Sequence, residues 1–326
     1  MAKTTKNNAT VSQEEFVKRL NDAIKDMKIS KKLFKGVNLN TGDTNYIRDL
    51  VRNYYTMQGN RIRTSNQASA LERSEKNNDI MNFFTEQLVV LEENINTFMD
   101  VYTKQHPIGI WLRSIYGIGP VIAAGLLSTF DVTKTKTAGG FWKYVGWEGG
   151  TTRQERKRGE KINYNPTART LAWKAGHSFK MGWKKESNIY GQMYAQKKEF
   201  YIEKNEDGGF AENAKRELDN KKYSKDSIAG KTYREGKLPA NHIDAMAQRF
   251  AAKMFLSHLF DVMYMYEYGT QPPVPYVEHI GHVHIDPPPK LDVIKPFLVK
   301  KWPDSDWDEI LKYKHRNTKN NLKTLD

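Results

Sequence analysis

Apolar side chains recur along this chain at the spacing of α-helices, and they mark two long helical segments. Between Asp79 and Gln105 they follow one another at alternating steps of three and four: Met81, Phe84, Leu88, Leu91, Ile95, Phe98 and Tyr102. This alternation, sustained for about three heptads, is typical of a coiled-coil seam. A second apolar stripe, over residues 239–268, predicts another long helix. The chain is therefore expected to be mainly α-helical.

Shorter helices are expected before the seam. Residues 1–12 are polar and are predicted to be disordered. Three helical candidates follow, at 13–28, 44–57 and 60–75. We therefore define a helical N-terminal region over residues 1–78, followed by a coiled-coil-like helix over residues 79–106.

The seam can be buried in two ways. It can pack against a second copy of the chain, or against the preceding helices of the same chain. The additional apolar side chains of Val89, Val90 and Met99 favour the first way. We therefore expect a homodimer that forms through residues 79–105.

The stretch 112–127 carries the most informative local pattern. Two short apolar runs flank Gly117, Ile118 and Gly119, and Pro120 opens the second run. Glycine permits the positive φ of a tight reversal, and proline fits the first turn of a helix. The pattern predicts a helix-hairpin-helix whose outward N–H groups, up to Val121, form an anion site. The alternative is a helical hairpin that only packs.

The remaining residues complete a helix-hairpin-helix domain and a tail. The domain is placed at residues 107–268. Within it, the polar, glycine-interrupted stretch 205–237 is predicted to be an insertion or a flexible excursion. Residues 269–326 are Pro-rich and basic, and from residue 300 onward we expect a loosely tethered arm.

The charge of the chain points to a polyanionic partner. There are 52 Lys and Arg against 38 Asp and Glu in 326 residues, a net charge of +14. Such a charge favours nucleic acid or an anionic membrane. A glycine-flanked basic segment follows the hairpin at residues 149–161, and we expect it to contact phosphates, although a solvated basic surface is the alternative. The candidate nucleic-acid-binding residues are Gly117, Ile118, Gly119, Val121, Arg153, Arg156, Lys157, Arg158, Lys161 and Arg169.

Other classes of protein and site are disfavoured. The absence of cysteine excludes disulfides and thiolate metal sites, and it makes a reducing, cytoplasmic compartment the simplest expectation. Since no apolar run approaches about 18 residues and the first residues lack an apolar signal core, we expect no membrane association. No Walker loop, zinc finger or H-E-x-x-H motif is present, and no cofactor is expected. Whether His279, His282 and His284 bind a metal or only pack is left open.

Several short patterns occur in an order that resembles a known family. They are the run 114–120, the glycine and aromatic residues of 139–146, the basic run 156–159 and the run 165–171. Together they resemble the C-terminal domain of the Piv/MooV and IS-110 class of insertion-sequence transposases, over residues 80–180. The segment 239–289 resembles phage- and element-encoded relatives that keep this domain alone. The resemblance implies binding of DNA in transposition or recombination, and the choice between DNA duplex, DNA junction and RNA is left open.

Two departures from this family bear on catalysis. Its full transposases carry an N-terminal RuvC-like nuclease domain with acidic metal ligands, whereas residues 1–78 show no strand alternation. Its nucleophilic serine precedes the basic segment, where this chain has Thr151 and Thr152. A threonine hydroxyl without a base is a weak nucleophile, so we assign no catalytic residue. The alternatives are an active recombinase that uses one of these threonines with a nuclease in trans, and a phage structural or assembly protein.

Overall fold

The computed structural model describes residues 12–25, 27–40, 42, 44–148, 158–273 and 287–311. Within these ranges it contains thirteen α-helices, three short 3₁₀ helices and no strand, which confirms the predicted helical class. In the same ranges, no helix combines the length and the apolar character that crossing a bilayer requires. The chain divides into two compact units, residues 1–105 and residues 106–326.

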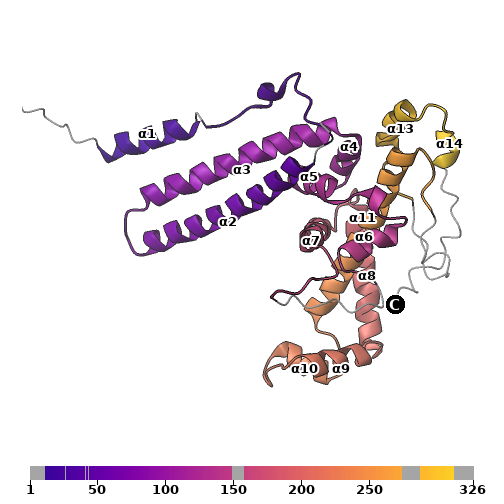
Figure 1. Cartoon of the computed structure of the whole chain (residues 1–326). Coiled ribbons are helices and arrows are strands. Elements are labelled where there is room, and N and C mark those ends of the chain that lie inside the picture. Colours follow the sequence, from indigo (N-terminus) through magenta and orange to yellow (C-terminus); the bar gives the residue numbers. More distant parts are fainter. Residues whose placement is uncertain are drawn as a thin grey trace, which may run out of the picture. The chain divides into compact units, whose positions relative to one another are not determined.

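A helical hairpin forms the framework of the first unit. Its two arms are α2 (Asn45–Arg73) and α3 (Asp79–Gln105), which lie side by side (Figure 1). Two smaller elements, α1 (Gln13–Lys25) and the 3₁₀ helix η1 (Lys31–Phe34), pack on α3. The segment 79–105 is one helix, as predicted. The two helices predicted at 44–57 and 60–75 are instead one, because a glycine such as Gly59 weakens a helix interior by only about 1 kcal/mol.

The seam of α3 packs on α2 of the same chain, which is one of the two ways of burying it. Phe98 of the seam packs edge-on against Tyr46 of α2, with the ring centroids 6.3 Å apart. Val90 and Met99, which favoured a dimer in the sequence, are buried within this unit and offer no surface to a second chain. Towards the other end of α3, Ile80 and Phe84 remain 55% and 48% exposed. The homodimer stays a prediction, with these two side chains as its candidate contacts.

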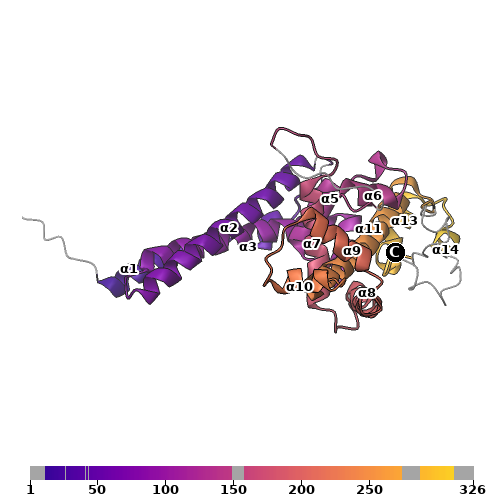
Figure 2. The same cartoon turned by 90° about the horizontal axis from the view of Figure 1, so that it is seen from below.

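The second unit is organised around α11 (Ala240–Tyr268), the second long helix that the apolar stripe predicts. Among the helices that pack on α11 are α6 (Ala138–Tyr144), α7 (Pro166–Met181) and α8 (Ile189–Glu206), as Figures 1 and 2 show. The helices α4 (Pro107–Ser114) and α5 (Pro120–Thr129) come before them in the chain. The ring of Phe255 on α11 contacts those of Trp111, Phe179 and Tyr190. This aromatic cluster joins α4, α7, α8 and α11 into one core.

The stretch 205–237 is ordered, and the prediction of a flexible excursion is wrong for it. It forms α9 (Ala211–Asn220) and α10 (Ile228–Arg234). The side chains of Phe210, Tyr233 and Leu238 are buried in a second cluster with the first turns of α11. Because these residues lie at the helix ends, they leave no periodic stripe in the sequence.

The C-terminal segment 287–311 is also packed, so the expectation of a loose arm is wrong as far as residue 311. It contains the 3₁₀ helix η3 (Leu291–Val293), α13 (Lys295–Lys301) and α14 (Trp307–Ile310), the two α-helices lying at the opposite end of α11 from α9 and α10 (Figure 1). Trp302 donates from Nε1 to the Tyr266 carbonyl at 3.0 Å. Residues 274–286, with all three histidines of the proposed cluster, and residues 312–326 lie outside the described part.

Candidate nucleic-acid interface

The turn between α4 and α5 depends on one glycine. The N–H of Ile118 donates to the Ile115 carbonyl at 3.2 Å and closes the reversal. Gly117 lies at its tip with φ of +80°, and a Cβ there would approach Cβ of Ser178 on α7 to 2.9 Å. This position needs glycine for its backbone conformation and for the close contact with α7. Gly117 nevertheless stays exposed to solvent.

The amides of this turn are open to a ligand. Among the described residues, no hydrogen bond is made by the N–H of Gly117 or Gly119. Gly119 is the N-cap of α5, Pro120 follows, and no side chain caps this helix end. Free N–H groups at a helix start carry partial positive charge and favour an anion.

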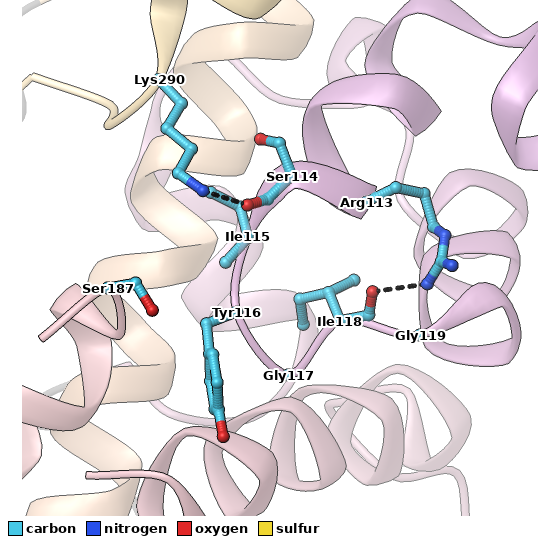
Figure 3. Close-up of a pocket in the computed structure, with 9 residues that line it drawn as sticks. All are labelled: Arg113, Ser114, Ile115, Tyr116, Gly117, Ile118, Gly119, Ser187 and Lys290. Atoms are coloured by element: carbon cyan, nitrogen blue, oxygen red, sulfur yellow. Dashed lines mark hydrogen bonds between the residues drawn. The ribbon is translucent and has the colours of Figure 1, made fainter. Parts of the chain in front are cut away.

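A pocket of about 490 Å³ opens over the turn (Figure 3). Arg113 and Lys290 lie on either side of the hairpin; Arg113 donates from Nη1 to the Ile118 carbonyl at 2.8 Å, and Lys290 donates from Nζ to the Ser114 carbonyl. Of the described residues that line the pocket, none carries a carboxylate. The pocket is therefore electropositive. Its lining consists of Arg113, Ser114, Ile115, Tyr116, Gly117, Ile118, Gly119, Ser187 and Lys290.

The predicted hairpin residues take different parts in this pocket. Gly117 and Gly119 line it, and neither N–H has a hydrogen-bond partner among the described residues. Ile118 is only 3% exposed and its N–H is used inside the turn, so it supplies shape and no donor. Val121 is buried and does not line the pocket. Sequence reasoning missed Lys290, because no local pattern links it to a turn 176 residues earlier.

Arg169 fixes the base of the basic segment. From Nη1 it donates to the carbonyls of Val145 and Gly146, both at 3.0 Å. Its guanidinium lies 5.6 Å from the ring centroids of Trp147 and of Tyr164. These contacts make Arg169 a positioning residue for the connection between α6 and α7, and they occupy part of the group that was predicted to reach phosphate.

The rest of the basic segment is described only in part. Arg158 and Lys161 are exposed. Arg153, Arg156 and Lys157 lie outside the described residues, as do Thr151 and Thr152. Arg169 and the hairpin contact Ser178 are nine residues apart on α7, hence about 14 Å apart along its axis and on opposite sides of it. The turn between α4 and α5 and the base of the basic segment therefore contact opposite sides of α7.

A second group of ionisable residues joins α7, α8 and α11. Asp244 accepts hydrogen bonds from Lys180, Lys198 and Tyr194. Burial acts to raise the pKa of Asp244, but these bonds outweigh it and lower that pKa to about 2. The carboxylate is held ionised between two ammonium groups, which is a structural arrangement.

The pocket over the turn between α4 and α5, which we call the hairpin pocket, offers a ligand backbone amides, the Lys290 ammonium and the Arg113 guanidinium. This set of donors is suited to holding phosphate. Elsewhere in the described ranges, no group of three His, Cys, Asp or Glu is arranged to hold a metal ion. No family model, curated protein or solved structure matches this chain.

Proposed function

We propose that this chain binds nucleic acid, and DNA in the first place, through backbone phosphates at the hairpin pocket. The observation that carries the proposal is the pair of open amides, at Gly117 and Gly119, beside the cations Arg113 and Lys290. Phosphate oxygens accept hydrogen bonds from backbone N–H groups and from basic side chains. A pocket that has these donors and no carboxylate in its described lining suits a polyanion.

The basic segment 149–161 is the second contact in this proposal. Arg158 and Lys161 are exposed at its end, and Arg169 fixes where the segment leaves and rejoins the domain. Together with the net charge of +14, the segment supplies attraction that does not depend on base sequence. We therefore expect weak sequence specificity, with RNA as a second possible ligand.

We further propose a role in DNA transposition or recombination, in a cytoplasmic protein encoded by a phage or another mobile element. The support is the order of the sequence patterns from residue 114 to residue 171, which resembles the C-terminal domain of IS-110 class transposases. The assigned role is DNA engagement without strand transfer, because the threonines stand where that family has its serine.

A salt titration of DNA binding tests the proposal. A labelled duplex of random sequence is titrated with the full chain at several salt concentrations, and log Kd is plotted against log salt. Contacts with three or more phosphates give a slope of about 3 or steeper in magnitude, since each contributes about 0.9. Absence of binding at low salt, or a flat plot, would reject nucleic-acid binding and favour a structural or assembly protein.

A further inference from the structure

We infer that Lys290 binds a phosphate group in the hairpin pocket, so that two segments far apart in the sequence build one site. This inference rests on the proposed function and adds to it the charged residue that holds the phosphate. Lys290 stands in the C-terminal segment, in which the sequence alone indicated only a basic tail.

The ammonium of Lys290 has capacity left for a ligand. It donates to the carbonyl of Ser114, the last residue of α4, while the side chain lines the pocket (Figure 3). An ammonium carries three N–H donors, and one carbonyl takes one of them. Since Lys290 is exposed, its remaining donors can reach an anion that sits over the turn.

The fold holds Lys290 in place through its neighbours. Trp111, which is fully buried, donates from Nε1 to the Pro289 carbonyl at 2.8 Å, and Pro288 is buried beside it. Lys290 itself has φ of 57°, in the left-handed region that lysine rarely adopts. A conformation of this kind is strained and persists where the surroundings impose it, often at ligand sites.

A purely structural role for Lys290 makes a different prediction. A lysine at the last carbonyls of a helix also stabilises that helix against its dipole. That role acts on the stability of the fold and leaves the salt dependence of DNA binding unchanged. The two roles are therefore separated by measuring unfolding and salt dependence on the same variants.

The test uses the full chain with the substitutions Lys290→Asn and Lys290→Arg. Asparagine tolerates the left-handed conformation and removes the charge, whereas arginine keeps the charge. Lys300→Gln is the matched control, because it removes one exposed charge from the same segment away from the pocket. Binding of a labelled duplex and of adenosine monophosphate is measured against salt, and thermal unfolding is recorded for each variant.

We expect Lys290→Asn to lower the magnitude of the salt slope by about 1 and to weaken duplex binding about tenfold near 0.1 M salt. Lys290→Arg and Lys300→Gln should keep the slope of the original protein. The unfolding temperature of all three variants should stay within a few degrees of that of the original protein. Adenosine monophosphate should bind far more weakly than the duplex, since it presents one phosphate to a site used by a polymer.

The outcomes separate this inference from the proposed function. If the duplex binds and Lys290→Asn keeps its slope and affinity, the inference is wrong and the proposed function stands. If the duplex does not bind but adenosine monophosphate does, in a manner that Lys290→Asn abolishes, the phosphate site stands and the proposed function is wrong. If neither ligand binds, both are wrong.

Discussion

At the residue scale, the hairpin depends on one of its two glycines more than on the other. Gly117 has φ of +80°, and a Cβ on it would lie 2.9 Å from Cβ of Ser178 and 3.3 Å from its carbonyl carbon. Gly119 has φ of −80°, and the nearest atom to its added Cβ is Nη1 of Arg113 at 3.9 Å. At Gly117, both the backbone conformation and the lack of space exclude other residues, whereas neither excludes them at Gly119.

We therefore predict that Gly117→Ala lowers the free energy of unfolding by about 1–3 kcal/mol, because alanine resists a positive φ and meets the α7 backbone. Gly119→Ala is the matched control and should change that free energy by less than about 0.5 kcal/mol. Urea unfolding of both variants measures the difference. DNA affinity should also fall for Gly117→Ala. If the two variants show the same free energy of unfolding, Gly117 is not required for the structure of the turn.

A second prediction at this scale concerns His106, which precedes α4. Burial, helped by the nearby charge of Lys301, lowers the pKa of its imidazole to about 4 from an ordinary value of 6.5. Below pH 6.5, the imidazole of His106 therefore binds a proton in the unfolded chain but stays neutral in the folded chain. Folding stability that is present above pH 6.5 should be lost as the pH falls towards 4.

Between pH 6.5 and pH 5, this loss should be on the order of 2 kcal/mol. Urea unfolding of the original protein and of His106→Gln over this range measures it, and the difference between the two isolates His106 from the other histidines. An identical pH dependence in both proteins would show that the imidazole titrates normally.

At the scale of elements, local signals were sufficient for α3, for α11 and for the turn between α4 and α5, but not for α2, which was predicted as two helices. The bounds of α3 follow from its seam. The start of α7 follows from Asn165, whose Oδ1 accepts from the N–H of Ala168 at 2.9 Å as an N-cap should. Such features depend on residues within one or two turns of each other, which is why sequence alone predicts them.

Elements that depend on distant contacts were not predictable in the same way. The segment 205–237 is polar, yet Phe210 and Tyr233 anchor α9 and α10 in a cluster with α11. The C-terminal segment is basic, yet Trp302 packs against Gly269, where α11 ends in the left-handed conformation. In both places a few large apolar side chains decide the packing, and average composition conceals them.

The residues of the candidate site fall into the same two groups, those that local sequence predicts and those that depend on distant contacts. The open amides of Gly117 and Gly119 were predictable from the turn itself. The position of Lys290 requires the contact between Trp111 and Pro289, and the engagement of Arg169 requires the end of α6. Charge in a sequence shows which residues are able to bind phosphate, but only the tertiary fold assigns them to a pocket or to a structural contact.

At the scale of the whole molecule, the two units have separable tasks in our proposal. All described residues of the hairpin pocket belong to the unit 106–326. The unit 1–105 has its own helical hairpin, and Ile80 and Phe84 lie exposed four residues apart, hence on one face of α3. Large apolar side chains that share an exposed face are typical of a contact surface, and self-association is the task that we assign to this unit.

We therefore predict that the full chain is a dimer in solution and that Ile80→Glu with Phe84→Glu converts it to a monomer, because two like charges then face each other across the contact. Light scattering during size-exclusion chromatography measures the mass. Asn82→Glu is the matched control, since it adds a charge to an exposed residue of the same turn on another face and should leave the dimer intact. Since both apolar side chains are about half exposed, the double variant should fold normally, which its helical circular dichroism would verify. A monomer for the original chain would show that α2, α1 and η1 of the same chain together cover the seam of α3, and each chain would then bind nucleic acid with a single hairpin pocket.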